Sequence, residues 1–204
     1  MWALVEDNTI TKIINNPKGL VIDNIQYSRN IFSFRWSNEE REAIGLYEIV
    51  FNNTNKKDEE YYINTNQSFA FADGVVTASY GSAPAKAHAD ANATDADGND
   101  LDPVVVIEGL KTKKIKVVKA QAATILQDTD WYIVRKADAG TSVPSAITTF
   151  RAAVRTKCAA METLITNASN TPAIETLYTY VNTADEGDPV VMERPLGEWP
   201  ELGS

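Results

Sequence analysis

The sequence is poor in the residue types that most often carry chemistry. Its 204 residues include one cysteine, Cys158, and one histidine, His88. A single cysteine cannot form an intramolecular disulfide, and a catalytic triad or a histidine-based metal site would depend on His88 alone. Glycine patterns that follow a strand and open a helix, as phosphate-binding loops require, are also missing. We therefore expect no catalytic residue, no cofactor and no metal site, and hence a protein that is not an enzyme.

Long apolar runs and excess basic charge are missing as well. No stretch approaches the ~18 apolar residues that a membrane-spanning helix needs. The opening residues 1–7 lack the basic and apolar regions of a signal peptide, so we expect synthesis in a reducing cytoplasm. The net charge of −9 argues against binding to nucleic acid or to an anionic membrane, because both need a basic surface.

What the sequence does contain is enough apolar material for a packed core, with hydrophobic residues at 44%. The patterns change along the chain and predict an α+β fold. Its β-rich N-terminal part would carry hairpins and one short helix, and a mainly α-helical C-terminal part would end in an extended tail. The predicted parts are a β-rich domain 1–80, a connector 81–103, a helical domain 104–184 and a tail 185–204.

Two hairpins are predicted in the first part. Apolar runs at 2–5 and 10–14 flank Asp7-Asn8, and the run 68–80 is interrupted by Asp73-Gly74. Both dipeptides tolerate the positive φ angles that tight hairpin turns require. Further strands are expected at 20–22 and 47–51.

A short helix is predicted between these strands. Ser37 and Glu40 have the spacing of a capping box, in which each side chain binds the backbone amide of the other residue. Gly45 is placed to end this helix in the left-handed conformation.

Residues 81–103 are rich in Ala, Asp, Asn and Gly and show no core periodicity, which favours a flexible connector. The acidic run 95–100 has some likeness to a calcium-binding loop. Such a loop needs a glutamate six residues after its glycine, Gly98, and that position is Val104. We therefore interpret the acidic run as a solvated turn.

The C-terminal half shows helical periodicity. Helices are expected at 111–127, after a Thr129 cap as far as Gly140, at 145–167, and from Thr171-Pro172. The helix 145–167 has one apolar stripe: Ile147, Phe150, Val154, Cys158, Met161 and Ile165. Cys158 is therefore expected to be a buried small side chain rather than a nucleophile.

A basic run lies in the first of these helices: Lys111, Lys113, Lys114, Lys116 and Lys119. It could contact an acidic partner or a nucleic acid, but we interpret it as the polar face of an amphipathic helix. If it does bind a partner, the acidic charge of the whole chain favours a protein.

Tryptophan supplies one further signal. Trp2, Trp36 and Trp131 lie in or beside predicted elements and are expected in the core. Trp199 lies in the tail, where no local helix can cover it. We expect Trp199 to dock either on its own chain or on a neighbouring subunit, because buried aromatic residues dominate interface energetics.

Several of these segments resemble proteins of tailed bacteriophages. Thr129-Asp130-Trp131, then Gly140, Val143-Pro144, a helix reading 150–155 as Phe-Arg-Ala-Ala-Val-Arg, and the late Trp199-Pro200-Glu201 resemble the C-terminal region of tail and tail-fibre assembly proteins. The segments 13–18, 29–32 and 63–69 are similar to tail-region proteins of marine T4-like myoviruses.

The resemblance implies a structural protein of the virion tail, baseplate or fibre attachment region, made in the host bacterial cytoplasm. Its partners would be other tail, baseplate or fibre proteins, with self-association left open, and not nucleic acid or membrane. The alternatives are a fibre-assembly chaperone that leaves the particle and, more remotely, a host-surface-binding module. The residues that carry the resemblance are expected to bind the partner: Trp199, Pro200, Glu201, Phe150, Arg151 and Arg155.

Overall fold

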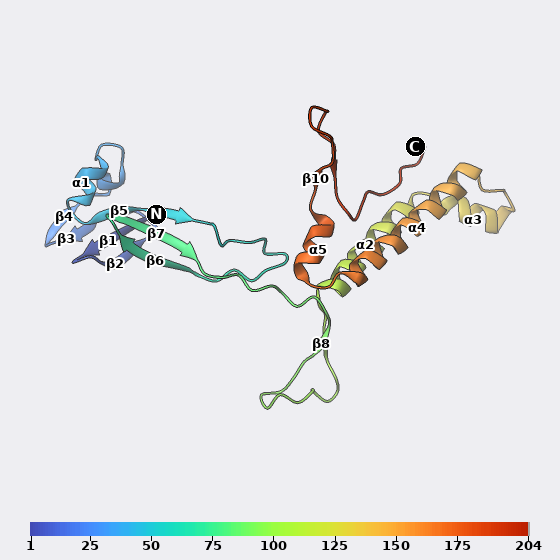
Figure 1. Cartoon of the computed structure of the whole chain (residues 1–204), viewed down its shortest axis with the longest axis horizontal. Helices are drawn as coiled ribbons and strands as arrows, with labels where there is room; N and C mark the ends of the chain where they lie inside the picture. Colours follow the sequence, from blue (N-terminus) through green and yellow to red (C-terminus); the bar gives the residue numbers. More distant parts are fainter. Residues whose placement is uncertain (204) are drawn as a thin grey trace. The chain divides into compact units, whose positions relative to one another are not determined.

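The computed structural model describes residues 1–203, and the chain divides into two compact units (Figure 1). The first unit, Met1–Pro84, is built from strands, and the second, Ala85–Ser204, is mainly helical. The predicted α+β class, with strands first and helices second, is therefore confirmed.

A five-stranded sheet forms the first unit, in the order β2-β1-β5-β7-β6. The strands are β1 (Trp2–Glu6), β2 (Thr9–Ile14), β5 (Leu46–Asn52), β6 (Gln67–Ala72) and β7 (Val75–Tyr80). Neighbouring strands are antiparallel except β5 and β7, which are parallel. The edge strands β2 and β6 contact each other, so the sheet curls toward a closed form.

Local turn chemistry explains the hairpins of this sheet. Asp7 and Asn8 have φ angles of 47° and 60°, and Asp73 and Gly74 have 51° and 76°, which confirms both predicted turns. A third hairpin joins β3 (Leu20–Ile22) to β4 (Ile25–Tyr27) through Asp23-Asn24, again at positive φ. Sequence analysis identified its first strand but not the turn.

The curled sheet is apolar on both faces. Alternate residues of β1 point to opposite sides, so that Ala3 and Val5 join one buried cluster and Leu4 joins the other. Ile10 and Ile13 from β2 and Phe69 and Phe71 from β6 complete the first cluster. The second is covered by β3, β4, the 3-10 helix η1 (Arg29–Phe32) and the segment that follows it: Tyr27, Ile31, Phe32, Trp36 and Ile44.

The predicted capping box opens α1 (Asn38–Glu42). The Glu40 amide donates to Ser37 Oγ at 3.2 Å, and the Ser37 amide donates to Glu40 Oε2 at 2.8 Å. The helix ends at Glu42, three residues earlier than predicted. Gly45 does have a positive φ of 76°, but it serves a turn into β5, where its carbonyl accepts from the Val5 amide at 2.8 Å.

Two long helices dominate the second unit, and Figure 1 shows α2 (Leu110–Gln127) and α4 (Ser145–Asn167) side by side. α3 (Asp130–Ala139) and α5 (Thr171–Tyr178) are shorter, and Gly140 ends α3 with a φ of 67° as predicted. The predicted α4 stripe is confirmed at Ile147, Val154, Met161 and Ile165, which are buried, whereas Phe150 and Cys158 are only partly covered.

Two short ribbons occur that sequence analysis did not predict, and Val181, expected in the last helix, lies in a strand of one of them. β8 (Ala91–Asn92) lies in the predicted flexible connector and pairs with β9 (Val106–Ile107). β10 (Val181–Asn182) pairs with β11 (Met192–Glu193), which lies in the predicted extended tail. Ribbons of this length carry too little alternation to be recognised from a pattern.

Candidate interaction surface

The C-terminal tail folds back onto the helices of its own unit. Leu196 is 2% exposed, and its amide donates to the Leu177 carbonyl at 3.0 Å. Trp199 is partly buried against the cluster of Val118, Met161 and Ile165, and its Nε1 donates to Gln121 Oε1 at 3.2 Å. Of the two expectations for Trp199, the structure shows docking on its own chain.

Polar side chains join two segments of the chain just before Trp199. We call the contacts among Tyr180, Arg194 and Glu198 the clasp. The Tyr180 hydroxyl donates to Glu198 Oε1 at 2.5 Å, and Arg194 Nε lies 2.9 Å from the same carboxylate. The hydrogen bond from Tyr180 is the main reason why the pKa of Glu198 is lowered, and it raises the pKa of Tyr180. The clasp therefore joins the end of α5 to the start of the docked tail.

An apolar hollow of about 460 Å³ lies beside Trp199 on the exposed side of α2. Its lining is Val117, Ala120, Gln121, Thr124 and Ile125 together with the Trp199 ring. Val117 is exposed although it is fully apolar. The tail thus covers only part of the apolar surface that α2 presents.

Phe150, Pro200 and Glu201 line a second hollow of about 350 Å³ at the start of α4. Phe150 and Pro200 are partly buried there, and Glu201 is exposed. The structure thus brings these three residues together at one hollow.

Arg151 has a different place from the other expected partner-binding residues. It is 7% exposed, and its NH1 donates to the Leu126 carbonyl at 2.8 Å and to Thr129 Oγ1 at 2.6 Å. Its NH2 lies 2.8 Å from Asp130 Oδ1. Arg151 therefore fixes the corner between α2 and α3 from inside the unit, whereas Arg155 is exposed and donates to the Arg151 carbonyl at 3.4 Å.

The same corner corrects the prediction for Thr129. It does occupy the N-cap position of α3, but its side chain makes no capping hydrogen bond. Its hydroxyl instead donates to the Leu126 carbonyl at 2.9 Å while accepting from Arg151. The sequence predicted the N-cap position of Thr129 correctly, but the tertiary contact with Arg151 determines which groups its hydroxyl binds.

Helix α3 contains no buried residue although it carries Trp131, Tyr132, Ile133 and Val134 in succession. Trp131 is 50% exposed and Val134 is 64% exposed. The prediction that Trp131 belongs to the core is therefore wrong. Arg135 lies over the Trp131 ring at 4.6 Å and over the Tyr132 ring at 5.6 Å, so its guanidinium covers only part of these aromatic side chains.

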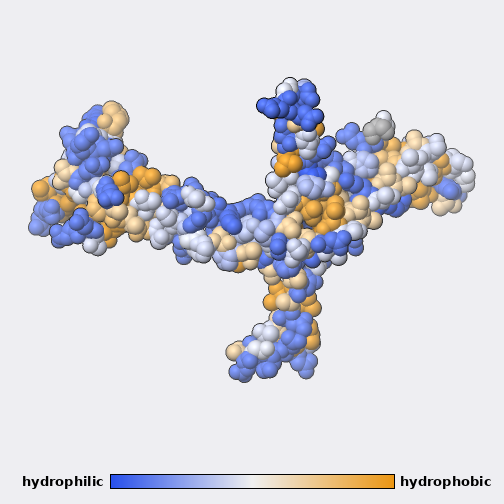
Figure 2. All heavy atoms as spheres, viewed as in Figure 1, coloured by the Kyte–Doolittle hydropathy of each residue, from blue (hydrophilic) through white to orange (hydrophobic). Residues whose placement is uncertain are grey.

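The β8–β9 ribbon is the second exposed apolar feature. Residues 104–107 read Val-Val-Val-Ile, and each side chain is between 49% and 59% exposed. Figure 2 shows apolar atoms gathered on the stem of this ribbon. The β10–β11 ribbon likewise exposes Val181, Val191 and Met192.

Most lysines of the basic run in α2 make contacts within their own unit. Lys114 is buried with its Nζ over the Tyr178 ring at 4.2 Å, so the prediction that it lies on a polar face is wrong. Lys111 donates to the Thr166 carbonyl at 2.8 Å. Lys119 lies 3.1 Å from Glu162, and Lys116 pairs with Glu108. Lys113 is exposed.

The acidic run 95–100 forms a turn held by its own first carboxylate. Asp95 Oδ1 accepts from the amides of Asp97 and Asn99, both at 2.9 Å, and the Asn99 amide is the main cause of the lowered pKa of Asp95. Among residues 1–203, no group of three or more His, Cys, Asp or Glu side chains could hold a metal ion.

Cys158 is partly buried on α4, with Sγ 3.4 Å from Glu162 Oε1. Burial is the main cause of the raised pKa of this thiol, and the Glu162 carboxylate adds to it. Both effects disfavour the thiolate that nucleophilic chemistry requires.

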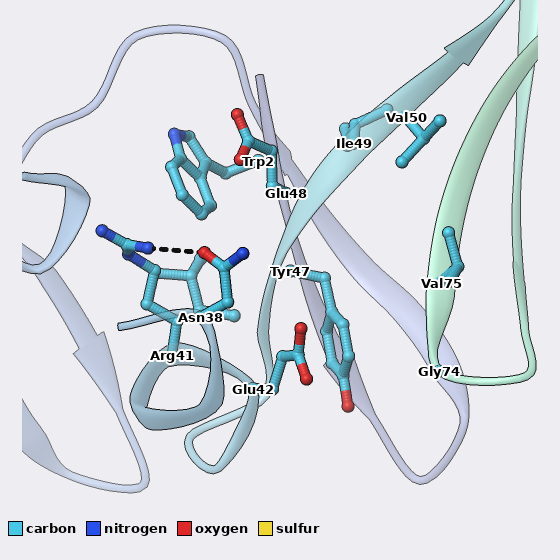
Figure 3. A pocket seen from close by; sticks show the side chains of 11 residues that line it. Trp2, Asn38, Arg41, Glu42, Tyr47, Glu48, Ile49, Val50, Gly74 and Val75 are labelled. Atoms are coloured by element: carbon cyan, nitrogen blue, oxygen red, sulfur yellow. Dashed lines mark hydrogen bonds between the residues drawn. The ribbon is translucent and has the colours of Figure 1, made fainter. Parts of the chain in front are cut away.

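The first unit has a hollow of about 260 Å³ between α1 and the sheet (Figure 3). Arg41 and Asn38, joined by a hydrogen bond of 2.9 Å, line one side, and Val50 and Val75 line another. Arg41 Nε also donates to the Ile31 carbonyl at 2.8 Å and its guanidinium lies over the Trp2 ring, so this cation is held by its own unit.

Among the described residues, no helix is both long enough and apolar enough to cross a membrane. No protein-family model matches the chain, and no curated protein or solved structure is significantly similar to it.

Proposed function

We propose that this chain is a structural protein of a tailed-phage virion, located in the tail, baseplate or fibre attachment region and acting by binding other proteins. The phage setting rests on the sequence resemblance of the segments around Trp131, Phe150 and Trp199. The binding role rests on the exposed apolar side chains of the second unit.

The observation that carries the proposal is helix α3. A ten-residue helix with Trp131, Tyr132, Ile133 and Val134 would fully bury some of these side chains if the unit worked alone, yet none of its residues is fully buried. Monomeric proteins seldom leave contiguous apolar patches uncovered, and larger ones mark interaction sites. Tryptophan and tyrosine are also the residues that most often dominate the energetics of an interface.

A fibre-assembly chaperone is the second candidate. The apolar hollow beside Trp199 favours it, because a chaperone needs a groove that an apolar client segment can occupy. Structural protein and chaperone differ in one respect that can be measured, namely whether the protein stays in the finished particle.

Quantitative mass spectrometry of gradient-purified phage particles and of infected-cell lysate tests the proposal. A structural protein is expected in particles at a fixed copy number that fits threefold or sixfold tail symmetry. Abundance in the lysate with absence from particles would contradict the structural role and favour the chaperone.

A further inference from the structure

The C-terminal tail is anchored on the helices of its own unit. Leu196 is buried, and its amide donates to the Leu177 carbonyl of α5 at 3.0 Å. Trp199 Nε1 donates to Gln121 Oε1 on α2 at 3.2 Å, and the clasp adds a third contact at the end of α5. We call residues 194–199 the anchor segment, and the surface of α2, α4 and α5 that holds it the seat. Seat and anchor segment are thus separate parts of the chain.

A ribbon connects the seat to the anchor segment. This hinge segment, residues 181–193, contains β10 and β11, and each of its residues except Ala184 is exposed. Its hydrogen bonds join residues of the segment to one another, such as the Thr183 amide to the Val191 carbonyl at 2.8 Å. The hinge segment would therefore open without breaking a hydrogen bond to the helices.

The hinge segment is longer than docking on the same chain requires. Val181 lies opposite Glu193, and a two-residue turn is enough to reverse a chain between paired strands. Extended at ~3.3 Å per residue, the segment would span roughly 40 Å, which exceeds the roughly 27 Å length of α2. It is therefore long enough to carry the anchor segment to the seat of a neighbouring molecule.

We propose that two copies of this chain exchange their tails, so that the anchor segment of each occupies the seat of the other. Leu196 and Trp199 of one copy then fill the seat of its partner, and the clasp forms between Tyr180 of one copy and Glu198 of the other. Every contact of the closed form is retained, as in other proteins that exchange an identical element. The inference goes beyond the proposed function, because it names a second copy as partner whatever particle the protein belongs to.

Exposed apolar side chains of the hinge segment favour the exchange. Val181, Val190, Val191 and Met192 are between 47% and 70% exposed. In the dimer the two hinge segments run in opposite directions beside each other, with β10 of each copy paired to β11 of the other, and these side chains gather at one place. Burial of apolar surface stabilises association. Because the other contacts are common to both forms, the hinge segment and the protein concentration decide between them.

Cross-linking of the full chain in a mixture of isotope-labelled and unlabelled copies tests the exchange. A Cβ added to Gly197 would clash with Lys157 Nζ, so this amine of α4 lies against the anchor segment, next to Glu198. A carbodiimide joins such an amine directly to a nearby carboxylate. The two kinds of copy are mixed in urea, refolded together at high micromolar concentration and cross-linked, and monomer and dimer are then separated by size.

The wild type is expected to form a dimer of twice its 22.4 kDa. In the dimer, peptides that link Lys157 to Glu198 should combine the two isotopes as often as random pairing of copies allows, whereas the monomer should yield linked peptides of one isotope only. A dimer with links of one isotope only would overturn the inference and indicate association through another surface. A wild type that stays monomeric would also overturn it.

A shortened hinge segment is the diagnostic variant. Replacing residues 183–191 by an asparagine-glycine turn keeps Asn182 opposite Met192 but removes the reach of the segment. This variant should lose the dimer while the Leu196 amide stays protected from hydrogen exchange, which shows that the closed tail is intact. In the matched control, residues 183–189 are replaced by glycine and serine at unchanged length, and the dimer should persist.

Two outcomes for these variants contradict the exchange. A shortened variant that dimerises as strongly as the wild type would overturn it, as would loss of the dimer in the control of unchanged length. The test also separates this inference from the proposed function. A monomeric protein that enters particles normally would overturn the exchange alone, and an exchanged dimer that is absent from particles would overturn the structural role alone.

Discussion

At the scale of single residues, Arg151 shows how a charged side chain can belong to the interior of a unit. Its guanidinium satisfies the Leu126 carbonyl and Thr129 Oγ1, and it pairs with Asp130. Arg151→Met would keep much of the volume but remove both hydrogen bonds and the ion pair with Asp130. We expect a loss of about 2–4 kcal/mol in the free energy of unfolding of the helical unit, measured by urea titration of the helical circular dichroism signal.

Arg155→Met is the control for that measurement, because Arg155 is exposed and lies one helical turn further along α4. Its effect should stay within about 0.5 kcal/mol. Equal effects of the two substitutions would mean that the contacts of Arg151 do not hold the corner.

Two glycines of the first unit allow the cost of a left-handed backbone to be separated from the cost of a close contact between a side chain and a neighbouring strand. Gly45 and Gly74 both have a φ of 76°. A Cβ at Gly45 would lie 2.5 Å from the Val5 carbonyl oxygen, whereas a Cβ at Gly74 would meet nothing within 4 Å. Gly74→Ala should cost about 1–2 kcal/mol through the left-handed conformation alone. Gly45→Ala should cost clearly more, as measured by thermal unfolding, and equal costs would show that the β1–β5 approach relaxes easily.

At the scale of elements, a buried position on α4 and an exposed position on α3 should differ sharply in the substitutions that they tolerate. Val154 on α4 is 0% exposed, and Val134 on α3 is 64% exposed. Val154→Asp would bury an unpaired carboxylate and should unfold the helical unit. Val134→Asp should change the free energy of unfolding by no more than about 0.5 kcal/mol. Circular dichroism of both variants checks this, and a soluble, fully helical Val154→Asp protein would contradict the assigned face of α4.

The clasp between α5 and the tail should depend on pH in a defined direction. The pKa of Glu198 lies below its ordinary value of 4.5, so the stability it contributes is present above pH 4.5 and is lost as the pH falls through the lowered pKa. The pKa of Tyr180 lies above its ordinary 10.0, so its contribution is present below pH 10.0 and is lost as the pH rises through the raised pKa.

Hydrogen exchange of the Leu196 amide, which donates to Leu177, reports on this clasp. After correction for the intrinsic exchange rate, its protection should be constant near neutral pH and fall in acid. Glu198→Gln should remove the acid dependence. Protection that falls equally in the variant would assign the effect to other carboxylates.

The elements differ in how far their sequences could predict them. The hairpins at Asp7-Asn8 and Asp73-Gly74, the Ser37 cap and the α4 stripe depend on interactions between near neighbours, which a local pattern records. The β8–β9 ribbon depends on Ala91 meeting Ile107 across a loop, and nothing in the composition of either strand indicates that partner.

The expected partner-binding residues also differ in how far the sequence could predict their surroundings. Phe150, Pro200 and Glu201 do line one hollow. Arg151 could not be assigned from sequence, because a charged residue on a helix carries no local sign of the carbonyl it will satisfy in another element. Trp131 was expected in the core because it lies in a predicted element, and only the fold shows that no residue of α3 is fully buried.

At the scale of the whole molecule, the two units use their apolar residues differently. The first buries apolar side chains on both faces of its sheet, although Val50, Phe51 and Val75 stay exposed on β5 and β7. The second has a core along α2 and α4 but leaves apolar residues open on α3 and on both ribbons. Helix α3, with four successive apolar or aromatic residues and no fully buried one, leads us to assign assembly to the second unit.

The most direct test of this assignment is the copy number of α3 variants in purified phage particles. Trp131→Ser with Val134→Ser removes exposed apolar surface from α3, and the matched control Val50→Ser with Val75→Ser does so in the first unit. We expect the α3 variant to keep its melting temperature but to be depleted from particles at least about tenfold, and the control to be incorporated normally. Normal incorporation of a stably folded α3 variant would contradict the assignment.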